Sequence, residues 1–84
     1  MKPVTIYSTQ TCPFCRQAKQ LLQSRGIPFQ EVDVTDDDQA RERLVEKADG
    51  RRTVPQIFIG EVGIGGYTDL AQLDREGKLR EMLA

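Results

Sequence analysis

Val4-Thr5-Ile6-Tyr7-Ser8-Thr9-Gln10-Thr11-Cys12-Pro13-Phe14-Cys15 is the stretch that decides the fold of this chain. Its apolar start is short and rich in β-forming residues, which predicts a strand. A polar loop follows, and Cys12-Pro13 predicts the start of a helix, because proline is favoured at the first helical position. The apolar face of that helix consists of Phe14, Ala18, Leu21 and Leu22. Gly26, with a proline just beyond it, predicts the end of the helix.

The segments after this helix continue the alternation of strand and helix. Within residues 29–34, valines alternate with acidic residues, which predicts a half-buried strand. Thr35 and the acids after it predict a helix start with a capping hydroxyl, and Gly50 predicts its end. The apolar face of this second helix consists of Ala40, Leu44, Val45 and Ala48. Because a helix connects them, the first two strands should be parallel.

The second half of the chain changes character. Residues 56–59 and 62–64 are apolar runs on either side of Gly60-Glu61, which predicts a hairpin with a tight turn. A helix is expected from about Thr68 to near Gly77, and a further short helix over residues 79–83. The chain is therefore predicted to be one α/β domain, residues 1–84: a four-stranded mixed sheet flanked by three helices, or four if the tail is helical. This is the layout of the thioredoxin fold.

Composition excludes several classes of function. A hydrophobic fraction of 38% with 30% charged residues is typical of a soluble globular protein. The net charge of −1 suggests no nucleic-acid or membrane partner, and no apolar run approaches the ~20 residues that span a bilayer. The N-terminal residues lack the apolar region of a signal peptide, so a cytoplasmic location is expected. The absence of histidine excludes a Cys–His dyad and a Cys₂His₂ zinc site within the chain.

Cys12 and Cys15 can be a zinc half-site, an iron–sulfur ligand pair or a redox dithiol. Either metal site needs more ligands than two cysteines provide, so a second chain would have to complete it. A C-x-x-C pair beside a strand–helix–strand unit is typical of redox proteins. A pair of inert buried cysteines is disfavoured, because a junction headed by proline normally lies at the surface.

The expected position of Cys12 at the helix N-terminus favours its thiolate. The N–H groups of Phe14 and Cys15 should point at its sulfur, and the helix macrodipole adds partial positive charge. The pKa of Cys12 is therefore expected below the ~8.5 of a free cysteine. Cys15 lies one turn further along the same edge of the helix. We interpret Cys12 as the attacking thiol and Cys15 as the resolving thiol, which together form a redox disulfide. Arg16 and Lys19 either add positive potential or are solvated surface charges.

Three segments together resemble the glutaredoxin family over almost the whole chain. They are Thr11-Cys12-Pro13-Phe14-Cys15, close to the family's Cys-Pro-Tyr-Cys, then Thr53-Val54-Pro55-Gln56-Ile57-Phe58, and Gly65-Gly66-Tyr67-Thr68-Asp69. The resemblance implies glutathione as reductant and co-substrate, and no metal. It implies a cis bond before Pro55, with the backbone of Val54 pairing with glutathione and Thr53 lining the same groove.

The same resemblance implies a second part of the glutathione site, formed by Gly66, Tyr67, Thr68 and Asp69 together with Phe14. Glycine allows a close approach of backbone to ligand, and the N–H groups of Thr68 and Asp69 at a helix N-terminus suit the γ-glutamyl carboxylate. The Asp69 side chain suits the ammonium; the alternative is that Asp69 only stabilises its own helix. Phe14 replaces the usual tyrosine, which removes one hydroxyl.

The chain departs from the family at Thr9, where many members carry a basic residue. The glycyl carboxylate of glutathione then relies on Arg51, Arg52 or Lys19, or binds more weakly. The implied partners are disulfide-containing or glutathionylated proteins, ribonucleotide reductase among the candidates, and a monomer is expected. One alternative is a glutaredoxin-like electron donor linked to thioredoxin reductase, which the Gly-Gly-Tyr-Thr-Asp segment disfavours. The other is a dimer that binds a [2Fe–2S] cluster through Cys12 and glutathione, which Pro13 disfavours.

Overall fold

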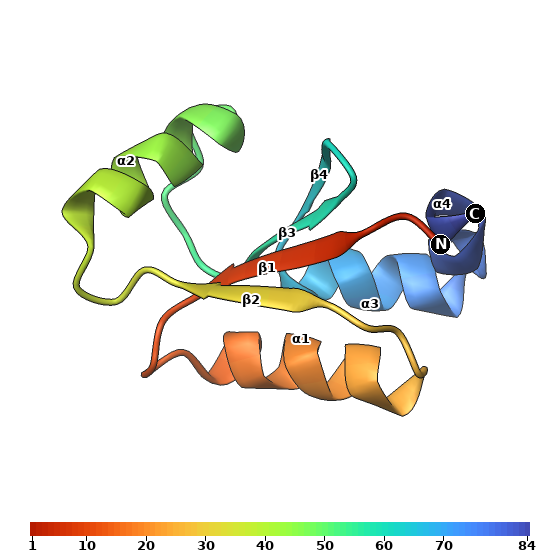
Figure 1. Cartoon of the computed structure of the whole chain (residues 1–84). Coiled ribbons are helices and arrows are strands. Elements are labelled where there is room, and N and C mark those ends of the chain that lie inside the picture. The colour runs from red at the N-terminus through yellow and green to blue at the C-terminus, as the bar shows by residue number, and fades with distance from the viewer.

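A single four-stranded sheet runs through the centre of the molecule (Figure 1). The computed structural model describes residues 1–84. The strands are β1 (Val4–Ser8), β2 (Gln30–Asp33), β3 (Gln56–Ile59) and β4 (Val62–Gly65), and their order in the sheet is β2-β1-β3-β4. β1 and β2 are parallel, as the connecting helix predicts, while β3 is antiparallel to both of its neighbours. The mixed sheet of the predicted α/β fold is confirmed.

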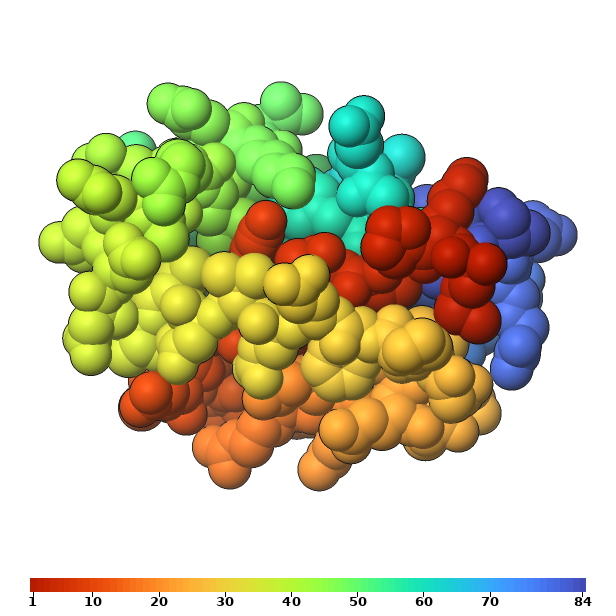
Figure 2. All heavy atoms as spheres, viewed as in Figure 1, coloured from red at the N-terminus to blue at the C-terminus, as the bar shows by residue number.

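Four helices cover the sheet: α1 (Pro13–Ser24), α2 (Asp38–Lys47), α3 (Tyr67–Arg75) and α4 (Lys78–Leu83). α1 and α3 lie on one face of the sheet and α2 lies on the other (Figure 1). The tail is helical, and the Lys2 N–H connects it to the other end of the chain by donating to the Leu83 carbonyl at 2.7 Å. The atoms of the two chain ends lie side by side in the space-filling view (Figure 2). No helix combines the length and the apolar character needed to cross a membrane.

Two hydrophobic clusters, one on each face of the sheet, hold the helices in place. The larger joins the sheet to α1, α3 and α4 and consists of Val4, Ile6, Ala18, Leu22, Ile27, Ile57, Ile59, Leu70, Leu79 and Leu83. The smaller lies under α2 and consists of Val34, Leu44, Ala48 and Phe58. Successive residues of β3 point to opposite faces, so this strand is buried on both sides. Its position next to β1 places the segment just before it, residues 53–55, at the centre of one sheet end.

Phe14 does not join the hydrophobic core, contrary to its assignment to the apolar face of α1. Its side chain is 55% exposed and stacks on Tyr67, with ring centroids 6.3 Å apart. Phe14 lies in the first turn of α1, where the helix end reaches α3 rather than the sheet. The spacing of apolar residues identifies the correct helical face but not how far the sheet extends beneath it.

Two helix starts differ from the sequence-based prediction. α2 is capped by the carboxylate of Asp37, which accepts a hydrogen bond from the Ala40 N–H at 3.0 Å, and not by the hydroxyl of Thr35. Thr35 instead accepts from the Gln10 N–H at 2.9 Å, which ties the loop before α2 to the loop before α1. α3 begins at Tyr67, so Thr68 and Asp69 both lie inside its first turn.

Arg25 and Asp74 connect α1 to α3 across the same face of the sheet. Two guanidinium nitrogens of Arg25 donate to the two carboxylate oxygens of Asp74 at 2.9 and 3.0 Å. This hydrogen bond and the charge of Arg25 hold the pKa of Asp74 below its usual value. Hydrogen bonds from Lys19 and Ser8 likewise lower the pKa of Glu31.

We expect the disulfide form to lose stability in acid but not between about pH 5 and pH 8, since it has no histidine to titrate there. The pKa values of the Asp74 and Glu31 carboxyls are lower in the folded protein than in the unfolded chain, where they are ~4. Their contributions to folding stability are therefore complete above the unfolded-state pKa and are lost as the pH falls through the folded-state pKa. Urea midpoints at pH 7 and pH 3 measure this loss. Asp74→Asn should lose less between the two pH values than the parent protein; an equal loss would contradict the assignment.

Candidate functional site

The cysteine pair lies at the N-terminus of α1, where the sequence predicts it. Cys12 is the N-cap residue, Pro13 is the first helical residue, and a disulfide joins Cys12 to Cys15 with their Cα atoms 5.2 Å apart. The Cys15 N–H donates to the Cys12 sulfur at 3.1 Å. Of the two N–H groups expected to do so, that of Cys15 makes this bond and that of Phe14 does not. Once the disulfide is reduced, the same N–H can stabilise negative charge on Cys12.

The two cysteines differ in exposure: Cys12 is 9% exposed and Cys15 is 1% exposed. The junction between the loop and α1 is thus more buried than its sequence suggests, because Val54 packs against it. The Val54 carbonyl oxygen lies 3.6 Å from the Cys12 sulfur. In the disulfide neither sulfur carries a proton, so this is a contact rather than a hydrogen bond. Cys12 is therefore the more exposed of the two cysteines, and Cys15 is almost fully buried.

The bond between Val54 and Pro55 is cis, as the resemblance implies. The backbone before it is held by Gln56, whose side-chain nitrogen donates to the Thr53 carbonyl at 2.9 Å and lies 3.2 Å from the Thr53 hydroxyl. Gln56 is 2% exposed, although its side chain has no role among the features predicted from the sequence. A polar residue within an otherwise apolar strand was the available signal, because a buried amide needs partners.

The turn before α3 packs against the cis-proline segment. The position that a Cβ on Gly66 would occupy is 3.5 Å from the Pro55 carbonyl oxygen. Asp69 accepts a hydrogen bond from the Gly66 N–H at 3.0 Å, so its carboxylate does stabilise the start of its own helix. A Cβ on Gly65 would collide with this carboxylate and lie 2.8 Å from Nη1 of Arg51. The turn therefore places Asp69 and Arg51 on the same side, next to the backbone of Gly65.

The stacked rings of Phe14 and Tyr67 complete the convergence of the three motifs. Their planes meet at 21°, so the N-terminal ends of α1 and α3 lie side by side. Cys12 contacts Val54, and Pro55, the next residue, lies against Gly66. Tyr67, which follows Gly66, stacks on Phe14. The three motifs therefore form one continuous surface around the sulfur of Cys12.

The basic residues proposed for a ligand carboxylate are placed very differently. Lys19 pairs with Glu31 at 2.8 Å and is thereby directed toward β2. The Arg52 carbonyl accepts a hydrogen bond from Arg41 at 3.2 Å, which fixes its backbone next to α2. Arg51 alone of the three lies beside Gly65. Pairing and position in the fold, and not proximity in sequence, separate these candidates.

A cysteine pair at a helix N-terminus, next to a cis-proline at the end of this mixed sheet, defines a thiol–disulfide oxidoreductase of the thioredoxin fold. The glutaredoxin family model matches residues 4–64. The chain is 50% identical to the glutaredoxin of Pseudomonas aeruginosa, over all of this chain and 99% of that protein. The chain therefore belongs to the glutaredoxin family.

Two solved structures show how closely the fold is shared. The solution structure of glutaredoxin from Brucella melitensis is 44% identical with a TM-score of 0.86, and the match covers 99% of this chain and 89% of that one. The crystal structure of a buckwheat glutaredoxin–glutathione complex is 30% identical with a TM-score of 0.87, covering 98% of this chain and 76% of that one. The four-stranded sheet with flanking helices is thus that of the family.

Proposed function

We propose that this protein is a glutathione-dependent oxidoreductase that reduces protein disulfides and protein–glutathione mixed disulfides. The observation that carries the proposal is the asymmetry of the cysteine pair. Cys12 is the more exposed of the two and accepts the N–H donor, whereas Cys15 is almost fully buried. In this proposal Cys12 and Cys15 are the catalytic residues. The buckwheat relative, whose structure is a complex with glutathione, supports the choice of reductant.

The reaction begins with attack of the Cys12 thiolate on a substrate disulfide. A mixed disulfide forms on Cys12, and the first substrate sulfur leaves as a thiolate. Cys15 then attacks the sulfur of Cys12, which releases the second substrate thiol and leaves the disulfide present in the structure. One glutathione opens this disulfide by attack on Cys12, and a second attacks the resulting mixed disulfide, which restores the dithiol and yields oxidised glutathione. With a glutathionylated protein, Cys12 alone suffices.

The surface around Cys12 would hold the cysteinyl and the γ-glutamyl parts of glutathione. The backbone of Val54, with Thr53 and Pro55, would pair with its cysteinyl part, and the rings of Phe14 and Tyr67 would border it. At the γ-glutamyl part, Gly66 would allow a close approach. The first N–H groups of a helix have no partner within the helix, so those of Thr68 and Asp69 would bind the γ-glutamyl carboxylate. The remaining carboxylate oxygen of Asp69 would bind the ammonium, and Arg51, which lies beside Gly65, would pair with a carboxylate of glutathione.

We also propose the wider setting that the sequence predicts. Residues 1–84 would act as one domain and as a monomer in the cytoplasm. Its partners would be glutathione and disulfide-containing or glutathionylated proteins, with ribonucleotide reductase among the candidates.

The test is the reduction of a small glutathione mixed disulfide with two competing electron sources. We expect rapid turnover with glutathione, glutathione reductase and NADPH. We expect little turnover when thioredoxin reductase and NADPH replace them, because the site is built for a γ-glutamyl tripeptide. NADPH absorbance measures both reactions. Turnover that depends on thioredoxin reductase and not on glutathione would overturn the proposal.

A further inference from the structure

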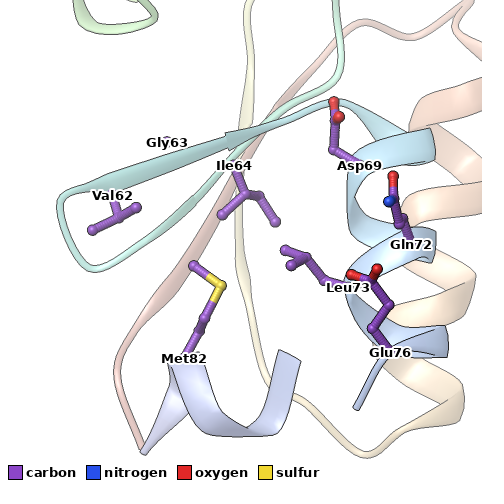
Figure 3. A pocket seen from close by; sticks show the side chains of 8 residues that line it. All are labelled: Val62, Gly63, Ile64, Asp69, Gln72, Leu73, Glu76 and Met82. Atoms are coloured by element: carbon purple, nitrogen blue, oxygen red, sulfur yellow. The ribbon is translucent and has the colours of Figure 1, made fainter. Parts of the chain in front are cut away.

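A hollow of about 380 Å³ lies between β4, α3 and α4, on the side of α3 that faces away from α1 (Figure 3). Apolar side chains form its walls: Val62, Ile64, Leu73 and Met82. Polar side chains form its rim: Asp69 and Gln72 on α3, and Glu76, the C-cap residue that follows this helix. Figure 3 shows the rim residues following one another down α3, with Met82 closing the hollow from α4.

The rim carries a carboxylate at each end, Asp69 and Glu76, with the neutral Gln72 between them, and the Arg51 guanidinium lies near Asp69. Asp69, Gln72 and Glu76 follow the spacing of one helical face, and Asp69 and Glu76 lie about 10 Å apart along the axis. The Glu76 side chain is 41% exposed, and its ion pair is a long 3.8 Å contact with the exposed Lys78. At the upper end, Asp69 belongs to the proposed glutathione site. The hollow is therefore continuous with that site and leads away from it.

One wall of the hollow is the edge strand of the sheet. β4 pairs only with β3, so its other edge presents unpaired backbone groups. Val62 on this strand is 57% exposed, an unusual exposure for a large apolar side chain. The rim from Asp69 to Glu76, about 10 Å long, accommodates about three residues of an extended peptide at ~3.3 Å each. Such an edge with adjacent side-chain pockets is how extended peptides are bound by strand addition.

We propose that this hollow is the docking site for the segment next to the reactive cysteine of a protein substrate, and that it selects extended segments in which apolar and basic residues alternate. The apolar walls receive one or two side chains, and the acidic rim pairs with lysine or arginine. A second copy of this chain is a poor occupant, because its own edge strand β4 directly follows the acidic Glu61 and has no basic residue to pair with the acidic rim. The inference rests on the proposed function in that the substrate is a disulfide, but it does not require glutathione.

The experiment uses the fully reduced protein and two synthetic peptides. Each contains one cysteine in a mixed disulfide with 5-thio-2-nitrobenzoate, flanked on one side by valines that alternate with lysine in one peptide and glutamate in the other. Cys12 thiolate attacks the peptide sulfur and the coloured thionitrobenzoate leaves with the electron pair. Cys15 then attacks Cys12 and releases the peptide thiol, so one dithiol is oxidised for each disulfide reduced. We expect the lysine peptide to react about tenfold faster, and the difference to shrink at high salt.

Glu76→Arg and Glu46→Arg are the matched variants. Each places the same charge at the C-terminal end of a helix, where a cation suits the helix dipole: Glu76 is the C-cap residue of α3, whereas Glu46 lies in the last turn of α2, on the opposite face of the sheet. Glu76→Arg should reduce the preference for the lysine peptide about fivefold. Glu46→Arg should leave it within about twofold, since its charge is distant and screened. Hydroxyethyl disulfide, which has no flanking segment, should react equally with all three proteins.

The outcomes separate this inference from the proposed function. An equal effect of both variants would assign the preference to net charge and overturn the docking site, as would no effect of either. A dimer in solution that Val62→Asp disrupts would assign the hollow to a second copy and also overturn it. If glutathione-coupled turnover fails while the lysine preference and its loss in Glu76→Arg persist, the docking site stands and the glutathione proposal falls.

Discussion

Replacing Cys12 by serine is expected to lower turnover of every disulfide substrate by at least about a thousandfold, because the reaction loses its nucleophile. Replacing Cys15 by serine should cost less than about tenfold on glutathionylated substrates, since glutathione can attack a mixed disulfide on Cys12 directly. The enclosed position of Cys15, 1% exposed behind Cys12, is the structural reason for this difference. Glutathione-coupled turnover of one glutathionylated peptide by both variants measures it. Equal loss in the two variants would contradict the assigned roles.

The Cys15→Ser variant also tests why Cys12 is the nucleophile. Its single thiol can be alkylated with iodoacetamide across pH, and the midpoint should lie below the ~8.5 of free cysteine. The Cys15 N–H that donates to the Cys12 sulfur is a backbone group, so the serine variant retains it. The same variant unfolded in urea is the control, since unfolding removes that donor and the helix N-terminus. Identical midpoints in the folded and unfolded protein would show that the helix does not stabilise the thiolate.

Gly65→Ala is expected to lower the free energy of unfolding by about 3 kcal/mol. Gly65 has φ of +103°, a backbone conformation that residues with a Cβ rarely adopt. The added methyl group would also meet the carboxylate of Asp69 and the guanidinium of Arg51. For a domain of this size the loss corresponds to a decrease in Tm of roughly 12–24 °C, measurable by circular dichroism. The variant should also raise the KM for glutathione, because Asp69 must move.

Gly77→Ala is the matched control for this prediction. Gly77 also has a positive φ, +73°, but nothing lies within 4 Å of the position that its Cβ would occupy. The free energy of unfolding of Gly77→Ala should therefore fall by only about 1 kcal/mol, the cost of the left-handed conformation alone. Its KM for glutathione should be unchanged. If Gly77→Ala destabilised the protein as much as Gly65→Ala, the close packing at residue 65 would contribute nothing.

Features that depend on residues near one another in the chain were predictable from the sequence. The period of apolar residues identified the strands and helices, and the connecting helix made β1 and β2 parallel. Cys12 before Pro13 placed the sulfur at a helix N-terminus, because capping involves only the next few residues. The hairpin at Gly60-Glu61 is equally local. In each case the determining interaction spans at most a few residues, so the local sequence is sufficient.

Only the tertiary structure decided the contacts between segments that lie far apart in the sequence. Phe14 lies against Tyr67 and outside the core, and Arg51, rather than Lys19, lies beside Gly65. The partial burial of Cys12 under Val54 and the hollow below β4 have the same origin. Each depends on how the helices are positioned on the sheet, and that positioning results from the packing of the whole core rather than from any single segment.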